Sequence, residues 1–414
     1  MIKRLLSSDL FAHRYYAFGL GVQKGTRFLI APLVIWAFGS QTYANYVLTF
    51  AAAQLVAMLM SLGTTNSLVV FWYQQPDKNV FVRSLALLIL GIGCAAAIPI
   101  GAALVCLPIL PPHVLPPLIW AALIVGYAAI YNWNSVGLSL VRVTERSRSY
   151  FFAVIATTAL LLILVASISH VSRNLVVLVC LYMTVLAIQS ALFISSSGIS
   201  IRGISTIADY KGFSKHVFSY SLPIVGYTLV SLTVITVDKW VVKFYYTVEQ
   251  FTQYVLNFQF AFAANIVSVV IGMYLLPSLC ELVEAENMAA LRRKVYTNYV
   301  LSLFGTSAIG FAMYVYAWGT NVRLTGPYWL LVLAFGFANM FTISVNVFEA
   351  FRDSAGLARI AIIPTVMFWV GFMLAAHAHE IVWNYLMFVI YYIVLFAGSV
   401  GKENRRRGAT KSAH

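Results

Sequence analysis

The sequence predicts an all-α polytopic membrane protein with about twelve transmembrane helices in two parallel six-helix lobes around a central cavity. Three observations support this fold class: an apolar composition, evenly recurring apolar runs and an internal repeat. The 414 residues are 61% hydrophobic and only 10% charged, with a mean hydropathy of +0.85. Soluble domains are about 45–50% apolar and about 25% charged. Little of the chain remains for a soluble domain.

Twelve apolar runs have the length of a membrane span. A helix needs about 20 apolar residues to cross roughly 30 Å of hydrocarbon. In chain order the predicted spans are Tyr15–Phe38, Tyr46–Trp72, Ser84–Leu107, Leu118–Leu140, Phe151–Ser169, Leu175–Ile194, Val217–Tyr245, Phe251–Leu276, Val295–Trp318, Tyr328–Ala350, Ala358–Ala376 and Ile381–Val400.

The placement of basic residues predicts the orientation. With the N-terminus in the cytoplasm, 21 of the 27 Lys and Arg fall in inward-facing segments, as the positive-inside rule describes. We therefore expect both termini to be cytoplasmic. The net charge of +14 then reflects topology and contact with anionic membrane lipids, so it does not indicate a nucleic-acid partner. The four cysteines show no metal-type spacing, and we expect neither a metal nor a cofactor.

An internal repeat relates the two halves of the chain. Residues 43–50 read YANYVLTF and residues 251–258 read FTQYVLNF, with four identities at an offset of 208. Both segments follow a span that begins in the cytoplasm, so the repeats run in the same direction. We predict an N-terminal lobe over residues 1–200 and a C-terminal lobe over 201–414 that ends in a short basic tail. Transporters built from such repeats bind substrate between them near the midplane.

Lys24 and Arg27 are the only charges in the first apolar run. Spaced i, i+3, they share one face of a helix. Charges near the bilayer centre are costly and are usually functional, so we predict that both line a substrate cavity and bind an anion. The alternative is that the side chains snorkel to the headgroups.

The seventh span carries the matching charges of the second half. Asp238, Lys239 and Lys243 lie in its outer part, and the two lysines share a helix face at i, i+4. We predict that Lys239 and Lys243 are further substrate-binding cations. For Asp238 two roles stay open, one in coupling to an ion and one in an ion pair.

Polar side chains also occur in the fourth and tenth spans. Glu349 is a second candidate for ion coupling or an ion pair. Four asparagines are candidates to line the cavity, although such residues more often join helices together: Asn132, Asn134, Asn339 and Asn346. Whether a proton, sodium, the membrane potential or no ion drives transport stays open.

Several stretches resemble bacterial polysaccharide flippases of the Wzx type, in the multidrug/oligosaccharidyl-lipid/polysaccharide exporter superfamily. They are KGTRFLIAPLVIWAFGSQTYANY at 24–46, SLGTTNSLVVFWYQ at 61–74, YSLPIVGYTLVSLTVITVDKWVV at 220–242 and YLLPSLCELVEAEN at 274–287. Leu222-Pro223, Asp238-Lys239 and Pro277 match motifs of that family in its seventh and eighth spans.

The resemblance implies a substrate and a location. The substrate would be an oligosaccharide repeat unit, such as O-antigen, on undecaprenyl diphosphate. The protein would flip it from the inner to the outer leaflet of the bacterial cytoplasmic membrane by alternating access. A polysaccharide polymerase and a chain-length regulator would be its protein partners. Fixed cations suit a diphosphate, because Arg offers it a bidentate fork and Lys a point charge.

Two other classes of protein stay open at this stage. One is another transporter of the same superfamily, either a peptidoglycan lipid flippase or a multidrug exporter, although a positive cavity would repel cationic drugs. The other is a membrane polysaccharide polymerase or a related enzyme. Because every predicted outer loop is about ten residues or fewer and offers no paired carboxylates for acid–base chemistry, we expect no catalysis.

Overall fold

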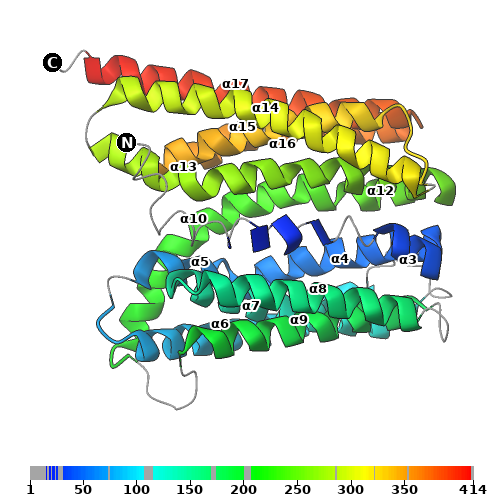
Figure 1. Cartoon of the computed structure of the whole chain (residues 1–414), viewed down its shortest axis with the longest axis horizontal. Helices are drawn as coiled ribbons and strands as arrows, with labels where there is room; N and C mark the ends of the chain where they lie inside the picture. Colours follow the sequence, from blue (N-terminus) through cyan, green and yellow to red (C-terminus); the bar gives the residue numbers. More distant parts are fainter. Residues whose placement is uncertain are drawn as a thin grey trace. The chain divides into compact units, whose positions relative to one another are not determined.

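The computed structural model describes residues 31–72, 75–106, 115–168, 174–199, 207–284, 287–320, 322–351 and 354–411, with isolated helical positions between 15 and 26. Within these ranges every regular element is a helix (Figure 1). The predicted all-α fold is therefore confirmed.

Between Ala31 and the linker that joins the repeats, the described residues form seven helices. They are α3 (Ala31–Phe38), α4 (Ser40–Ser61), α5 (Thr64–Phe71), α6 (Lys78–Cys106), α7 (Pro117–Val143), α8 (Ser147–Ile168) and α9 (Leu175–Ser197). The second predicted span consists of α4 and α5, which are separated by Leu62 at φ +44° and Gly63 at φ +67°. Gly63 suits this bend, because glycine adopts the left-handed conformation without a steric penalty.

The second half repeats this order of helices. It contains α10 (Tyr210–Thr236), α11 (Asp238–Tyr245), α12 (Val248–Phe262), the short 3₁₀ helix η2 (Ala263–Asn265), α13 (Ile266–Glu284), α14 (Met288–Gly319), α15 (Tyr328–Ala350), α16 (Ser354–His377) and α17 (Ile381–Lys411). The seventh predicted span is thus α10 with α11, and the eighth is α12 with η2 and α13.

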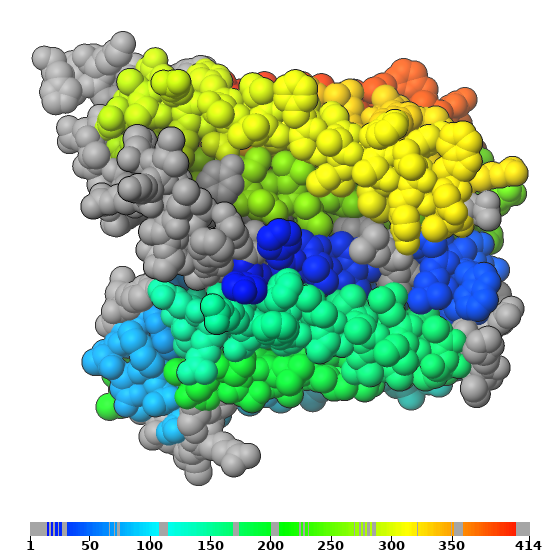
Figure 2. All heavy atoms as spheres, viewed as in Figure 1, coloured from blue at the N-terminus to red at the C-terminus, as the bar shows by residue number. Residues whose placement is uncertain are grey.

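The described helices have the length and composition of membrane spans. Nine helical segments within the described ranges are long and apolar enough to cross a bilayer. Large apolar side chains are exposed along α14, among them Phe304 at 72% and Phe311 at 61%. Figure 2 shows the atoms of α14, in yellow-green to yellow, at the surface of the C-terminal unit. Exposed apolar faces of this extent suit contact with lipid. The chain is a multi-pass membrane protein.

The chain divides into two compact units, Met1–Leu229 and Val230–His414. The first part of α10 packs within the N-terminal unit. Its Phe213 and Val217 join a buried cluster with Phe81 of α6, and Ser221 shares a hydrogen bond of 2.9 Å with Ser67 of α5.

The helices of the second half follow those of the first by a nearly constant number of residues. Counterparts begin at Ala31 and Asp238, Ser40 and Val248, Lys78 and Met288, Pro117 and Tyr328, Ser147 and Ser354, and Leu175 and Ile381, which gives offsets of 206 to 211. The packing also repeats, since α7 packs against α9 in one unit as α15 packs against α17 in the other. The repeat thus extends over the helices of both units.

Candidate functional site

Two of the predicted site residues, Lys24 and Arg27, lie outside the described residues. The side chain of Glu349 is likewise not among those described. Their predicted roles stay predictions. Lys243 is half-buried at the end of α11, with its ammonium 5.6 Å from the centre of the Phe251 ring.

Asp238 and Lys239 form a buried ion pair at the start of α11. Their side chains are almost fully buried, and Lys239 Nζ lies 3.2 Å from Asp238 Oδ1. The ammonium also donates to the Ile235 carbonyl at 2.5 Å and lies 3.7 Å from the centre of the Phe258 ring. The Tyr254 hydroxyl donates to Asp238 Oδ2 at 2.6 Å. Each charge is therefore compensated within the C-terminal unit, as buried charges require.

A second group of polar side chains extends this cluster. The ring of Tyr254 packs against that of Tyr385, with centroids 5.2 Å apart. Asn257 donates to the hydroxyls of Tyr385 at 3.1 Å and Thr325 at 2.5 Å. Asn257 Oδ1 accepts from the Thr325 amide at 3.1 Å and from Gln253 at 3.2 Å. These bonds tie α12, α17 and the segment before α15 together, so the network stabilises the unit.

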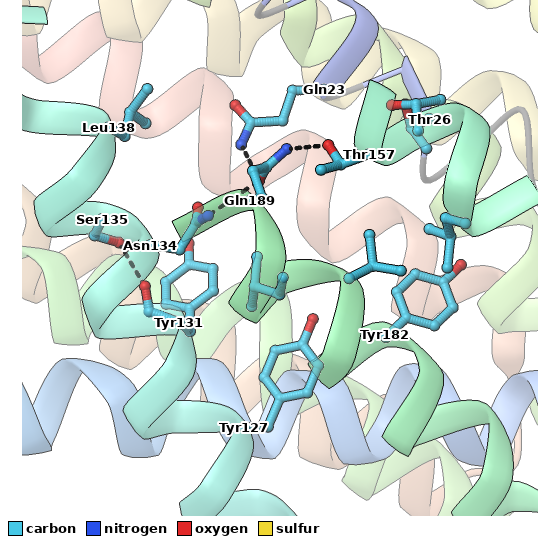
Figure 3. Close-up of a pocket in the computed structure, with 14 residues that line it drawn as sticks. Gln23, Thr26, Tyr127, Tyr131, Asn134, Ser135, Leu138, Thr157, Tyr182 and Gln189 are labelled. Atoms are coloured by element: carbon cyan, nitrogen blue, oxygen red, sulfur yellow. Dashed lines mark hydrogen bonds between the residues drawn. The ribbon is translucent and has the colours of Figure 1, made fainter. Parts of the chain in front are cut away.

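The N-terminal unit contains a polar cavity of about 190 Å³. Its walls come from positions 23 and 26 of the first span and from α7, α8 and α9 (Figure 3). The lining residues are Gln23, Thr26, Tyr127, Tyr131, Asn134, Ser135, Leu138, Thr157, Thr158, Leu161, Tyr182, Val185, Leu186 and Gln189.

Gln189 is the centre of the hydrogen bonds at this cavity. Its Oε1 accepts from Asn134 Nδ2 at 3.1 Å and from Gln23 Nε2 at 3.3 Å. Its Nε2 donates to the Thr157 hydroxyl at 2.9 Å. Gln23 Oε1 in turn accepts from the Tyr150 hydroxyl at 2.9 Å. Figure 3 shows this group of side chains gathered around Gln189. Side chains from the first span, α7 and α8 therefore meet at the Gln189 amide of α9.

The cavity lining combines neutral polar groups with aromatic rings. The described residues that line it include no Asp, Glu, Lys, Arg or His. Tyr127 and Tyr182 are held by other rings, Tyr127 by Phe50 at 5.3 Å and Tyr182 by Tyr46 at 4.6 Å between centroids. A cavity of this kind can offer hydrogen bonds and an aromatic surface without charge.

The four candidate asparagines lie in different surroundings. Asn134 lines the cavity, whereas Asn132 on the same helix donates to the Ala57 carbonyl at 3.0 Å. Asn339 donates to the carbonyl of Ala264 at 2.9 Å and to Thr306. Asn346 is buried, and no described group accepts from its Nδ2.

Gln23, Thr157 and Gln189 were not predicted from the sequence. Single amides in apolar runs usually join helices, so nothing in either run marks them as unusual. The repeat contains the missing signal. The counterpart of Gln189 at an offset of 206 is Leu395, and that of Thr157 at an offset of 207 is Pro364. These positions are therefore polar in the first half and apolar in the second.

Comparison with solved structures shows which known fold the chain has. No protein-family model and no curated protein sequence matches the chain. An inward-facing multidrug resistance MATE family transporter of the MOP superfamily superposes with a TM-score of 0.76 at 11% identity, over 94% of this chain and 96% of that one.

Two further structures extend the comparison. A MATE transporter of Vibrio cholerae gives a TM-score of 0.61 at 15% identity, over 96% and 97% of the two chains. The lipid II flippase MurJ in an inward closed conformation gives 0.67 at 12%, over 95% of this chain and 87% of that one. At such identities a likeness shows the fold alone. The chain has the fold of MOP-superfamily transporters.

Proposed function

We propose that the protein is a flippase for undecaprenyl-diphosphate-linked oligosaccharide repeat units, such as those of O-antigen. It moves them from the inner to the outer leaflet of the bacterial cytoplasmic membrane by alternating access. This proposal unites the Wzx-type resemblance of the sequence with a fold that is similar to that of the lipid II flippase MurJ.

The neutralised state of Asp238 is the observation that carries the proposal. Among the described side chains within the apolar parts of the helices, Asp238 is the only carboxylate, and Lys239 compensates it at 3.2 Å. The described side chains of the spans therefore present no uncompensated anion to a cationic drug, and the side chain of Glu349 in α15 is not among them. An exporter of cations would need an uncompensated anion, because an opposite charge attracts the substrate strongly in a low-dielectric cavity.

The charges of the first apolar run are positive. Lys24 and Arg27 lie in the first apolar run with no acid in that run. A diphosphate loses hydration when it crosses the membrane, and fixed guanidinium and ammonium groups replace part of that loss. We assign Arg27 the larger share, because it lies deeper in the run and can bind phosphate through two parallel hydrogen bonds.

An export assay with one charge removed tests the proposal. In the source bacterium, deletion of the gene should leave carrier-linked repeat units in the inner leaflet and remove the surface glycan. Arg27→Gln should reproduce this defect at normal membrane abundance. The matched control is Arg292→Gln, which removes an exposed charge at the start of α14 and should leave export unchanged.

The same assay separates the alternatives. Normal surface glycan in the deletion strain would contradict the proposed function. Accumulation of lipid II instead of glycan repeat units would identify a peptidoglycan lipid flippase, the second candidate, which the likeness to MurJ favours. Sensitivity to cationic drugs with normal glycan would identify a multidrug exporter.

A further inference from the structure

We propose that the cavity of the N-terminal unit is a subsite for an uncharged sugar ring of the transported head group. The cavity is the one centred on Gln189, Asn134 and Gln23. This inference rests on the function proposed above and adds to it where the sugar binds and which class of sugar fits.

The C-terminal unit serves as an internal control for the role of these polar groups. In the repeat, Asn134 corresponds to Phe341 at an offset of 207 and Gln189 to Leu395 at an offset of 206. Phe341 is 4% exposed and Leu395 is fully buried. The register of α7 with α15 is supported by the bond from Asn132 to the Ala57 carbonyl, which recurs at an offset of 207 from Asn339 to Ala264. The offset of 206 for Gln189 is that between the starts of α9 and α17.

The fold therefore does not require amides at these positions. At these two positions the second half holds buried apolar side chains, which is the ordinary solution for a core. The first half instead holds Asn134 and Gln189 there, beside a cavity. Burying such groups costs free energy unless they are hydrogen-bonded, and the bonds to Gln189 offset part of that cost. A ligand in the cavity would use the hydrogen-bonding capacity that remains.

The cavity keeps hydrogen-bonding capacity for a ligand. Asn134 uses Nδ2 toward Gln189, and no described group donates to its Oδ1. The Tyr131 hydroxyl makes no hydrogen bond with a described residue, and the Ser135 hydroxyl donates to the Tyr131 carbonyl at 3.0 Å and can still accept. Amide and hydroxyl groups that both donate and accept suit the hydroxyls of a sugar.

The size and the walls of the cavity fit one ring. Its volume of about 190 Å³ is far above the roughly 10–15 Å³ that one water molecule needs, so the cavity has room for a small ring. The rings of Tyr127 and Tyr182 supply flat apolar faces, and Figure 3 shows the Tyr127 hydroxyl directed toward the amide group. Sites of this kind combine apolar walls with a few oriented polar groups.

The charge of the lining selects the class of sugar. No Lys, Arg or His is present among the described lining residues, so a uronic acid would place its carboxylate where nothing described compensates it. Hexoses and N-acetylhexosamines carry no such penalty.

Binding of defined lipids to the purified full-length protein tests the subsite. Native mass spectrometry in detergent would measure the Kd of undecaprenyl diphosphate alone and of its glucosyl, galactosyl, N-acetylglucosaminyl and glucuronyl derivatives. At least one neutral sugar should bind more tightly than the sugar-free lipid, and the glucuronyl derivative should not.

Two asparagines on α7 provide a matched pair of variants. Asn134→Ala removes a cavity group and should reduce the preference for the sugar-bearing lipid by about 3- to 10-fold, as expected for one hydrogen bond. Asn132→Ala removes a group bonded to the Ala57 carbonyl away from the cavity and should leave that preference unchanged. Both variants should bind the sugar-free lipid as the wild type does.

The outcomes separate the two proposals. Binding of no diphosphate lipid would overturn the proposed function, and the subsite with it. Equal binding of the sugar-free and all neutral-sugar lipids would overturn the subsite alone. The same holds if the glucuronyl lipid binds most tightly, or if Asn132→Ala and Asn134→Ala reduce the sugar preference equally. A preference for a neutral sugar that only Asn134→Ala weakens would support the subsite.

Discussion

Asn132 and Asn339 make the same buried hydrogen bond in the two halves of the chain. Each side-chain amide donates to a backbone carbonyl 75 residues earlier, Asn132 to Ala57 at 3.0 Å and Asn339 to Ala264 at 2.9 Å. The bonds join α7 to α4 and α15 to η2. A sequence repeat of eight residues thus reflects a structural repeat that extends to individual contacts.

The two asparagines should contribute unequally to stability. Asn339 also donates to Thr306 at 2.8 Å, whereas Asn132 makes only the carbonyl bond among the described residues. Hydrogen bonds between membrane helices contribute about 0.6 kcal/mol on average and up to about 1.7 kcal/mol. Replacement by Leu should therefore lower the thermal unfolding temperature more at 339 than at 132. An equal or reversed order would contradict this assignment.

Lys239→Met should destabilise the protein strongly. The substitution leaves Asp238 buried without its ammonium partner, and breaking a buried pair in this way costs about 3–5 kcal/mol. The double variant Asp238→Asn with Lys239→Met should recover much of the loss, because no uncompensated charge remains. Thermal unfolding of the four proteins in detergent gives the coupling energy. Additive losses would show that the two side chains do not interact.

Gly310 should tolerate no side chain. A Cβ there would lie 2.6 Å from Val332 Cγ1 at the contact between α14 and α15, and a β-branched neighbour has few rotamers with which to yield. Gly310→Ala should cost about 1–3 kcal/mol by overpacking. Gly319→Ala, at the end of the same helix, meets no atom within 4 Å and should be nearly neutral. Comparable losses in both variants would exclude close packing as the cause.

Gln189→Leu should separate stability from transport. The residue becomes the one that the second half holds at position 395, where Leu is fully buried. Because Asn134, Gln23 and Thr157 each lose a hydrogen-bond partner, the thermal unfolding temperature should fall, but only by a few degrees. Export of the lipid-linked repeat unit should nevertheless fall at normal membrane abundance. Export at the wild-type rate would show that the amide serves only the fold.

The sequence predicted the helices better than the breaks within them. Apolar runs of span length gave the membrane fold, because hydrophobic length is a strong constraint in a bilayer. The bend at Leu62 and Gly63 and the 3₁₀ turn Ala263–Asn265 were not predicted, since each lies inside a run that the sequence predicts as one continuous span. Composition indicates where a span lies, but it gives little information about bends and 3₁₀ turns within the span.

The candidate site was harder to predict than the fold. Asn134 was a candidate from the sequence, yet its partner Gln189 lies 55 residues further along the chain. Gln23, which donates to the same Gln189 oxygen, lies 166 residues before Gln189, so no local pattern joins the three. The acid–base pair of Asp238 and Lys239 was visible as neighbours, but only the structure shows the hydroxyl of Tyr254 and the ring of Phe258 around it. Tertiary contacts decide which polar residues act together.

The apolar residues at the repeat positions that correspond to the cavity amides have a consequence for how such a protein can diversify. The second half has the buried apolar residues Phe341 and Leu395 at these positions. The first half has the amides Asn134 and Gln189, which line the cavity. On the proposed function, a new glycan specificity would need only a few substitutions around Gln189. The duplicated half would keep the scaffold intact meanwhile, so recognition could change faster than architecture.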